Sequence, residues 1–214
     1  MGRDRRASHA GSLTRMWEDR YRAAGDYLFG VAPAAFLADN ARWLTPGLRA
    51  LSVADGEGRN SVFLAEKGLE VSAFDMAPTA VARARALAAA KGVVVDFHVS
   101  TWEEWDWTEG QYDLVSAIFI QFANPAARVQ QFDDLRRAVA PGGVLMLHGY
   151  TPEQVALGTG GPGDPAHMYT PEILRTGFGD WQIERLEAYE RDISEGKGHS
   201  GRSALIDLIA RKPG

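Results

Sequence analysis

The sequence contains no cysteine. A disulfide framework, a zinc site built on thiolates and a cysteine nucleophile are therefore excluded. A surplus of basic residues is also missing, because 23 Lys and Arg stand against 28 Asp and Glu and give a formal net charge of −5. This balance argues against a dedicated nucleic-acid surface, which normally needs a basic face. No apolar run approaches the roughly 20 residues that a membrane span requires.

The first twelve residues, MGRDRRASHAGS, carry charge but no apolar segment, so they do not have the pattern of a secretory signal. We expect residues 1–14 to form a disordered arm and residues 15–214 to form one domain, a length that suits a single core. The hydrophobic share of 45% and the charged share of 24% are those of an ordinary globular protein. These features indicate a cytoplasmic enzyme or binding protein.

Strand-like and helix-like segments alternate through the middle of the chain. After two helices predicted over 13–24 and 33–44, the pattern predicts strands over 48–54, 69–74, 93–99, 112–120 and 144–150. Between them lie helical segments that end near residue 67 or cover 78–91 and 126–139. Such alternation favours right-handed βαβ units and a parallel sheet covered on both faces. The predicted fold class is α/β.

The last third of the sequence has a different pattern. Residues 151–169 are rich in Gly, Pro and Thr, and a short helix is predicted over 171–176. Two strand-like runs, 181–191 and 203–211, are joined by a short turn over 195–201 and should pair antiparallel. A parallel sheet that ends in an antiparallel hairpin is not typical of dinucleotide-dependent oxidoreductases.

A ligand site is expected beyond the carboxyl ends of the parallel strands. The loop after the first strand contains Gly56 and Gly58, which let the backbone approach a ligand closely. Asp75 ends the second strand about 20 residues further on, where a carboxylate can accept hydrogen bonds from ribose hydroxyls. The alternatives are a tight strand-to-helix turn for the loop and a helix cap for Asp75.

The ends of the third and fourth strands would flank an adenine. Thr101 offers a polar contact there, and Trp102 or Phe119, with Ile118 beside it, offers an apolar one. We also expect Trp17, on the first helix, to line the site. Core packing is the default role of a tryptophan, and we assign it to the remaining ones, Trp43, Trp105, Trp107 and Trp181.

A family resemblance rests on residues 53–65, which read VADGEGRNSVFLA, and on the acid at position 75. This pattern resembles the class I S-adenosylmethionine-dependent methyltransferases. The motif GEGRN resembles the corresponding motif of the small bacterial group around the tellurite-resistance (TehB-like) and thiopurine methyltransferases. Residues 17–21, then Phe29-Gly30 and Pro33, also resemble the opening helix and loop of that group. The resemblance covers residues 17–150 and the closing hairpin.

The resemblance implies a Rossmann-like, doubly wound sheet of seven strands, mostly parallel with the last strand antiparallel, and helices on both faces. It also implies S-adenosyl-L-methionine as the cofactor. In such families the loop after the first strand holds the methionyl part, and the matching residues here are Ala54, Asp55, Gly56, Gly58 and Asn60.

In the same families the acid after the second strand holds the ribose, which assigns that contact to Asp75, and its neighbour Met76 is also expected to bind the cofactor. The end of the third strand holds the adenine. Arg20 and Tyr21 on the first helix would clamp the carboxylate of the ligand, as the corresponding helix does in similar enzymes.

Two positions depart from the family pattern. Ala54 stands where the first glycine is usual and crowds the backbone by one methyl group. Thr101 stands where the family has an acid that accepts from the adenine amino group. A hydroxyl oxygen can still accept that hydrogen bond.

The acceptor side is predicted from topology. If the sixth strand runs parallel to the first five, its turn into the seventh lies at the ligand edge of the sheet. His199 is then the leading base or acceptor-orienting residue, because it is the side chain in that turn that titrates near neutral pH. A solvent-exposed histidine at the hairpin tip is the alternative. Tyr150 could also face the acceptor, whereas His148 is expected to be structural.

The function predicted is in-line methyl transfer from S-adenosylmethionine to a small molecule, with the nucleophile about 3–3.5 Å from the methyl group and water excluded. The acceptor could be a thiol, a selenium or tellurium oxyanion, or a small oxygen or nitrogen nucleophile. No metal, nucleic acid or membrane partner is expected, and the protein would be a monomer or homodimer. The alternatives are a nicotinamide-dependent oxidoreductase, since a glycine loop followed by an acid serves both cofactors, and a protein that binds S-adenosylmethionine without turnover.

Overall fold

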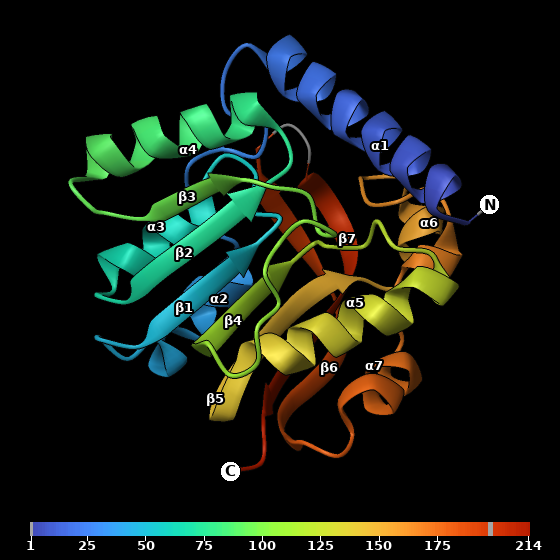
Figure 1. Ribbon diagram of the computed structural model, residues 1–214. Coiled ribbons are helices and arrows are strands. Elements are labelled where there is room, and N and C mark those ends of the chain that lie inside the picture. The colour runs from blue at the N-terminus through green and yellow to red at the C-terminus, as the bar shows by residue number, and fades with distance from the viewer. Residues whose placement is uncertain (1, 197–198) are drawn as a thin grey trace.

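A computed structural model describes residues 2–196 and 199–214, with the backbone alone for residues 2–10. Its centre is one seven-stranded sheet with the order β3-β2-β1-β4-β5-β7-β6 (Figure 1). β1 to β5 pair in parallel, and β7 lies antiparallel between β5 and β6. The predicted fold is confirmed. The strands are β1 (Arg49–Val53), β2 (Glu70–Asp75), β3 (Asp96–Val99), β4 (Tyr112–Ile118), β5 (Val139–Tyr150), β6 (Gln182–Glu195) and β7 (His199–Arg211).

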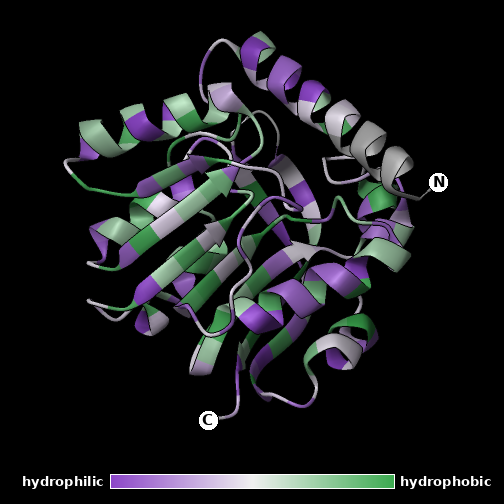
Figure 2. Ribbon diagram, in the orientation of Figure 1, coloured by the Kyte–Doolittle hydropathy of each residue, from purple (hydrophilic) through white to green (hydrophobic). Residues whose placement is uncertain are grey.

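Helices cover both faces of this sheet. Side chains of α2, α3 and α4 pack on one face, and those of α5 and α7 pack on the other. Hydrophobic residues are concentrated in the central strands, while α5 carries many hydrophilic ones (Figure 2). The helices are α1 (Gly2–Ala24), α2 (Ala35–Asp39), α3 (Arg59–Glu66), α4 (Pro78–Lys91), α5 (Pro125–Ala138), α6 (Gln154–Leu157) and α7 (Pro171–Phe178), with 3-10 turns η1 (Ala41–Trp43) and η2 (Pro165–His167).

The N-terminal part of the structure differs from the sequence expectation. Instead of a disordered arm over residues 1–14, helix α1 begins at Gly2. Arg and Ala, which have high helix propensity, occupy five of the eight positions from 3 to 10 and continue the helix predicted over 13–24. The helix predicted over 33–44 is shorter, since α2 ends at Asp39 and a 3-10 turn follows.

The closing hairpin is longer than predicted. β6 and β7 pair along their whole length, from Gln182 opposite Arg211 to Glu195 opposite His199. The tip of the predicted turn, Lys197 and Gly198, lies outside the described residues. Because β6 runs in the same direction as β5, the end of the hairpin that carries His199 lies at the carboxyl edge of the parallel strands. Among the described residues, no helix combines the length and apolar content needed to cross a membrane.

The contact between α3 and α4 requires glycine at position 58. Gly58 has a φ of +90°, and a Cβ built there would lie 2.7 Å from the Cβ and 2.8 Å from the Cα of Ala84. Real Cβ atoms do not approach backbone this closely, so α4 could not keep its place against α3. The glycine loop is thereby fixed in position by packing as well as by its own conformation.

We predict that Gly58→Ala lowers the free energy of unfolding by about 2–4 kcal/mol, because it adds overpacking to a left-handed backbone. Gly92→Ala is the matched control. Gly92 also has a positive φ, +68°, but nothing lies within 4 Å of its added Cβ, so strain alone should cost about 1 kcal/mol. Urea unfolding of both variants measures the difference, and equal losses would contradict the packing argument.

Candidate functional site

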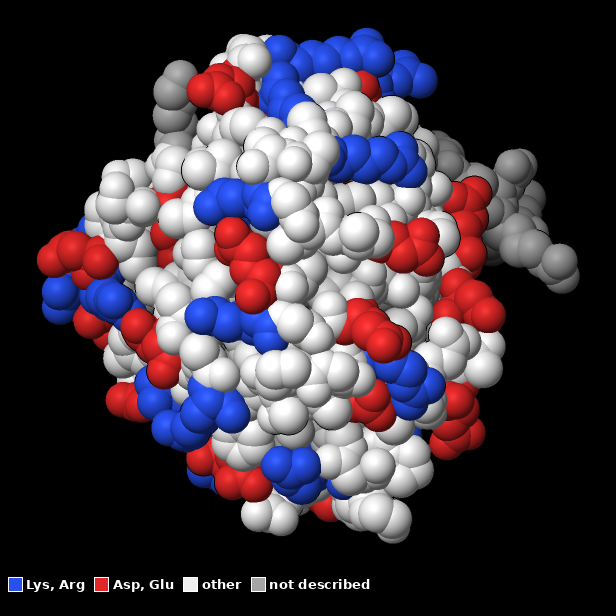
Figure 3. Space-filling view, turned by 90° about the vertical axis from the view of Figure 1, so that its left-hand side faces the viewer, with Lys and Arg blue, Asp and Glu red and all other residues white. Residues whose placement is uncertain are grey.

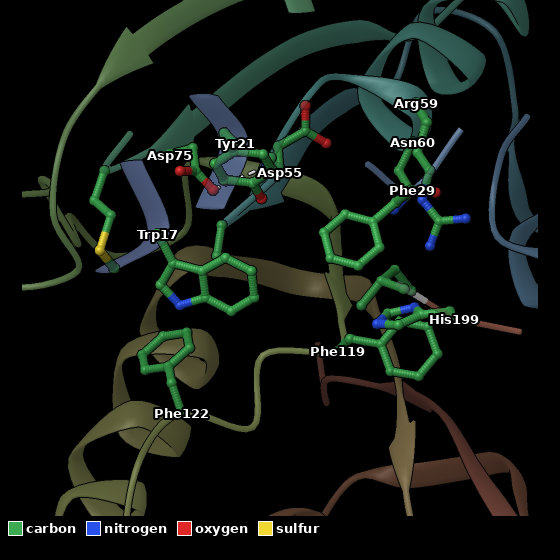
Figure 4. A pocket seen from close by; sticks show the side chains of 14 residues that line it. Trp17, Tyr21, Phe29, Asp55, Arg59, Asn60, Asp75, Phe119, Phe122 and His199 are labelled. Carbon is green, nitrogen blue, oxygen red and sulfur yellow. Dashed lines mark hydrogen bonds between the residues drawn. The ribbon is translucent and has the colours of Figure 1, made fainter. Parts of the chain in front are cut away.

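A pocket lies at the carboxyl ends of β1, β2 and β4, under α1 and beside the hairpin (Figure 4). It brings together residues from the glycine loop, the end of β2, the end of β4, the N-terminal segment and β7. Most of the cofactor residues predicted from sequence line it, as does His199. The lining consists of Trp17, Tyr21, Phe29, Ala54, Asp55, Gly56, Arg59, Asn60, Asp75, Met76, Ile118, Phe119, Phe122 and His199.

The loop after β1 is held in an unusual conformation. Ala54, at the position where the family has glycine, has a φ of +47°, in the left-handed region that few non-glycine residues adopt. The carboxylate of Asp55 is buried and turned inward, where it accepts hydrogen bonds from the hydroxyls of Ser52 and Ser61 and from the Ser61 backbone N–H. Burial raises the pKa of Asp55, and these hydrogen bonds oppose the rise. The Asp55 carboxylate therefore fixes the shape of the loop.

Asp75 is the second buried carboxylate of the pocket. One of its oxygens accepts the Gly56 backbone N–H and the other the Ala77 backbone N–H, both at 2.9 Å. Burial raises the pKa of Asp75 to about 6, against the two backbone hydrogen bonds, and the nearby carboxylates of Asp55 and Glu57 add to the rise. Both oxygens are thus oriented by backbone groups while the side chain still lines the pocket.

Aromatic side chains of the N-terminal segment cover the pocket. The rings of Trp17 and Tyr21 on α1 lie 5.7 Å apart, and Phe29 lies 6.4 Å and 6.3 Å from them. α1 is fastened to the start of α4 by Glu18, which accepts hydrogen bonds from the backbone N–H and the hydroxyl of Thr79. The expectation that Trp17 and Tyr21 lie at the site agrees with this placement.

Polar residues of the glycine loop tie the segment after α1 to the site. Glu57 is buried, accepts the Leu28 backbone N–H at 2.7 Å and pairs with Arg83 at 2.6 Å. Asn60 accepts the Ala34 backbone N–H at 2.9 Å. The loop that lines the floor of the pocket therefore also positions part of its cover.

His199 lies inside the pocket and not in solvent at a hairpin tip. Its ring centre lies 4.6 Å from that of Phe29 and 4.2 Å from that of Phe119, whose φ of +56° is also left-handed. Its buried Nδ1 has no hydrogen-bond partner within the described part of the chain. Burial, followed by electrostatic interactions with Arg59, His148 and Arg20, lowers the pKa of His199 to about 3. The imidazole is therefore neutral at physiological pH.

Tyr150 lies behind His199 and does not line the pocket, which corrects the expectation that it faces the acceptor. Its ring centre is 4.7 Å from that of Phe119 and 5.7 Å from that of His199. Gln121 holds the Tyr150 backbone by accepting its N–H and donating to its carbonyl, each at 2.7 Å. The hydroxyl is buried, and burial raises the pKa of Tyr150. Tyr150 therefore packs against Phe119 and His199.

His148 is buried, as expected of a structural residue. Its Nδ1 lies 2.7 Å from a carboxylate oxygen of Asp207, the residue opposite it on β7. Its ring stacks on Phe36 at 5.1 Å and meets the edge of Phe119 at 4.8 Å.

Four predicted cofactor residues lie outside the pocket lining. Trp102 is buried in the core, where its Nε1 donates to Asp134 at 2.8 Å. Thr101 bonds through its hydroxyl to Glu104 at 3.1 Å, since the chain turns away after β3. Arg20 is exposed and stacks over the ring of Trp17 at 4.8 Å. Gly58 supports the site through its contact with α4 instead of lining it.

Three lining residues were not predicted: Phe29, Arg59 and Phe122. Phe122 occupies the place expected for Trp102, whose ring lies behind it at 5.7 Å. Arg59 is the first residue of α3 and forms a buried ion pair with Glu195 at 2.8 Å, their side chains being 7% and 8% exposed. Phe29 and Arg59 lie in the segments that carry the family resemblance, so the resemblance could have predicted both as lining residues.

In this sheet β7 is inserted antiparallel between β5 and β6, and the pocket lies beyond the glycine loop. This arrangement is that of the class I methyltransferase fold. Residues 50–143 match the family described as a methyltransferase domain. An uncharacterized protein of Mycobacterium tuberculosis is 31% identical over 150 residues, which are 69% of this chain and 53% of that protein. The chain spans about half the length of the curated relatives it matches.

Solved structures share the fold. The TehB structure from Haemophilus influenzae superposes with a TM-score of 0.67 at 16% identity, covering 86% of this chain and 63% of that one. A structure from work on the conversion of a disulfide bond into a thioacetal group during echinomycin biosynthesis gives a TM-score of 0.74 at 22% identity, covering 94% and 92%. The predicted resemblance is confirmed for the fold, and residues 50–143 match a methyltransferase domain.

The raised pKa of Asp75 predicts a specific dependence of stability on pH. The folded protein, with a pKa of about 6 at this group, binds the proton more tightly than the unfolded chain, whose pKa is near 3.8. The stability that Asp75 contributes is therefore complete below about pH 4 and is lost as the pH rises through 6, by up to about 3 kcal/mol. In Asp75→Asn this part of the pH dependence should be missing.

Urea unfolding between about pH 4 and pH 7.5 measures this difference. The free energy of unfolding of the wild type minus that of Asp75→Asn should fall as the pH rises, whatever constant offset the amide introduces. Asp133→Asn, at an exposed position of α5, is the control and should follow the wild type. A difference that stays constant over this range would show that Asp75 titrates normally.

Proposed function

We propose that this protein is an S-adenosylmethionine-dependent methyltransferase that acts on a small-molecule acceptor. The observation that carries the proposal is a pocket in which the glycine loop, the buried Asp75 and the end of β4 meet an aromatic cover and His199. The methyltransferase-domain match over residues 50–143 supports the same conclusion.

The residues of the pocket fit S-adenosylmethionine. Each carboxylate oxygen of Asp75 accepts one backbone N–H and keeps a second lone pair, which suits the two ribose hydroxyls. Met76, Ile118 and Phe122 supply the apolar surface that an adenine needs. Glycine at position 56 lets the Tyr21 hydroxyl approach the loop closely, because a Cβ there would lie 2.8 Å from the hydroxyl oxygen.

When bound, S-adenosylmethionine supplies a methyl group on a positively charged sulfur. This sulfur is a good leaving group, because it departs as a neutral thioether. The protein then has to bind both reactants, align them and exclude water. Trp17, Phe29 and Phe119 provide aromatic faces suited to a sulfonium and cover the pocket against solvent. Phe119 keeps its strained backbone because its N–H donates to the His148 carbonyl at 2.8 Å, and strain of this kind is common where a site is pre-organised.

His199 orients the acceptor. Its buried Nδ1 has no partner within the described part of the chain, and the neutral imidazole can accept a hydrogen bond from the acceptor or donate one to it, depending on the tautomer. A pKa of about 3 makes the imidazolium unfavourable. The site therefore favours acceptors that arrive with a free lone pair, such as thiolates, chalcogen oxyanions and unprotonated amines, because these need no strong general base.

The cover of the pocket favours a small acceptor over a macromolecule. The hairpin approaches the N-terminal segment so closely that a Cβ at Gly196 would lie 2.4 Å from the backbone carbon of Phe29. On the face shown in Figure 3, acidic and basic residues alternate and neither sign forms a continuous stripe of the kind that a nucleic acid would need.

We predict that S-adenosylmethionine and S-adenosylhomocysteine bind with micromolar affinity in calorimetric titration. Asp75→Ala should weaken both by at least tenfold, because the ribose hydroxyls lose their acceptor. Asp133→Ala, at an exposed position of α5, should bind as the wild type does. Binding of a nicotinamide cofactor with no response to either adenosyl ligand would instead support the oxidoreductase alternative.

We predict that His199→Phe lowers methyl transfer by roughly a hundredfold while S-adenosylmethionine still binds, because the ring packing is kept and only the hydrogen bond that orients the acceptor is lost. Formation of S-adenosylhomocysteine in a screen of thiols, selenite, tellurite, phenols and amines measures this. Since the pKa of His199 is about 3, the wild-type rate should show no step from this residue near pH 6.5. Unchanged turnover in His199→Phe would remove His199 from the mechanism, and no turnover by the wild type would favour a non-catalytic binding protein.

A further inference from the structure

The pocket contains a buried cation to which the proposed function has given no role. Arg59 carries the one permanent positive charge among the described residues that line the pocket. Its side chain is 7% exposed, and Figure 4 shows it extending from α3 toward His199. Burying a guanidinium is costly unless it is paired and hydrogen-bonded, and the ion pair that compensates it within the described chain is the one with Glu195.

Arg20, which the family resemblance assigned to the ligand carboxylate, is poorly placed for that role. It is exposed, and its guanidinium stacks over Trp17 at 4.8 Å and over Phe29 at 5.9 Å, on the outer side of the aromatic cover. A carboxylate inside the pocket would therefore meet Arg59 and not Arg20. Arg59 also follows Gly58 directly, at the start of α3 and beside the glycine loop.

The present partner of Arg59 is itself a carboxylate. Glu195 places one oxygen 2.8 Å from the guanidinium and accepts the backbone N–H of Ala35 with the other, at 3.0 Å. A guanidinium has five N–H donors and can hold a carboxylate by two parallel hydrogen bonds, so the single contact with Glu195 leaves donors for a second carboxylate. The geometry at Arg59 is thus that of a carboxylate site whose occupant in the structure is Glu195.

We propose that Arg59 binds the carboxylate of the methionyl group of S-adenosylmethionine, in competition with Glu195. This inference rests on the proposed function. Since Glu195 pairs with His199 across the β6–β7 ladder and also holds the start of α2, the same ion pair connects the methionyl end of the cofactor with the acceptor-side histidine. The negative charge of Glu195 weakens cofactor binding, and its contacts keep the cover in place when the cofactor is absent.

The test compares two ligands that differ only in the carboxylate, S-adenosylmethionine and decarboxylated S-adenosylmethionine, by calorimetry. The double variant Arg59→Gln/Glu195→Gln removes both buried charges together, so no unpaired charge remains in the core. We expect it to bind S-adenosylmethionine at least tenfold more weakly than the wild type and the decarboxylated ligand with unchanged affinity. Retained binding of the decarboxylated ligand also shows that the variant is folded.

Glu195→Gln alone supplies a second arm, because the amide oxygen can still accept the Ala35 N–H while the competing charge is gone. We expect it to bind S-adenosylmethionine several-fold more tightly, with no change for the decarboxylated ligand. An unchanged ratio of the two affinities in the double variant would overturn the assignment of Arg59. If the double variant does not fold, the Glu195→Gln variant alone tests the proposal. Binding of S-adenosylmethionine by this variant that is unchanged or weaker than that of the wild type overturns the proposal. A wild type that binds neither ligand refutes the proposed function itself, and the inference with it.

Discussion

Three buried carboxylates around the loop after β1 impose the main constraint on this structure. An ionised carboxylate away from water must be satisfied by donors, and each acid obtains them from a different part of the chain. Asp55 takes them from serines beside the loop, Asp75 from backbone groups at Gly56 and Ala77, and Glu57 from Leu28 and Arg83. The loop, the end of β2 and the segment after α1 therefore hold one another in place, and the pocket is formed where they meet.

The two sides of the pocket differ in charge, and this difference fits the proposed reaction. The acid at the end of β2 suits a neutral sugar with hydroxyl donors. On the opposite side, Arg59 adds to the desolvation that keeps His199 neutral, while aromatic rings surround the imidazole. Methyl transfer from a positively charged donor next to a neutral, enclosed histidine depends on alignment of the two reactants and exclusion of water more than on strong base catalysis.

The sequence patterns predicted the fold and much of the pocket because they depend on local features. Alternating strands and helices fix a parallel sheet, and the carboxyl ends of its strands bring Gly56, Asp75 and Phe119 to one edge. Topology alone carried the prediction for His199, since a sixth strand parallel to the fifth must end at that edge. Ala54, which stands at the glycine position of the family pattern, has a left-handed conformation in the structure.

Choices between similar residues could not be made in this way. Whether Trp102 or Phe122 faces the pocket, and whether Arg20 or Arg59 is its cation, depends on contacts between distant segments: Trp102 with Asp134, and Arg59 with Glu195. By itself the sequence determined the order of elements and the edge where chemistry occurs, because periodicity and turn residues act over a few positions. Only the tertiary structure decided which side chains are buried there and what charge they carry, because burial and pairing depend on residues far apart in the chain, such as Arg59 and Glu195.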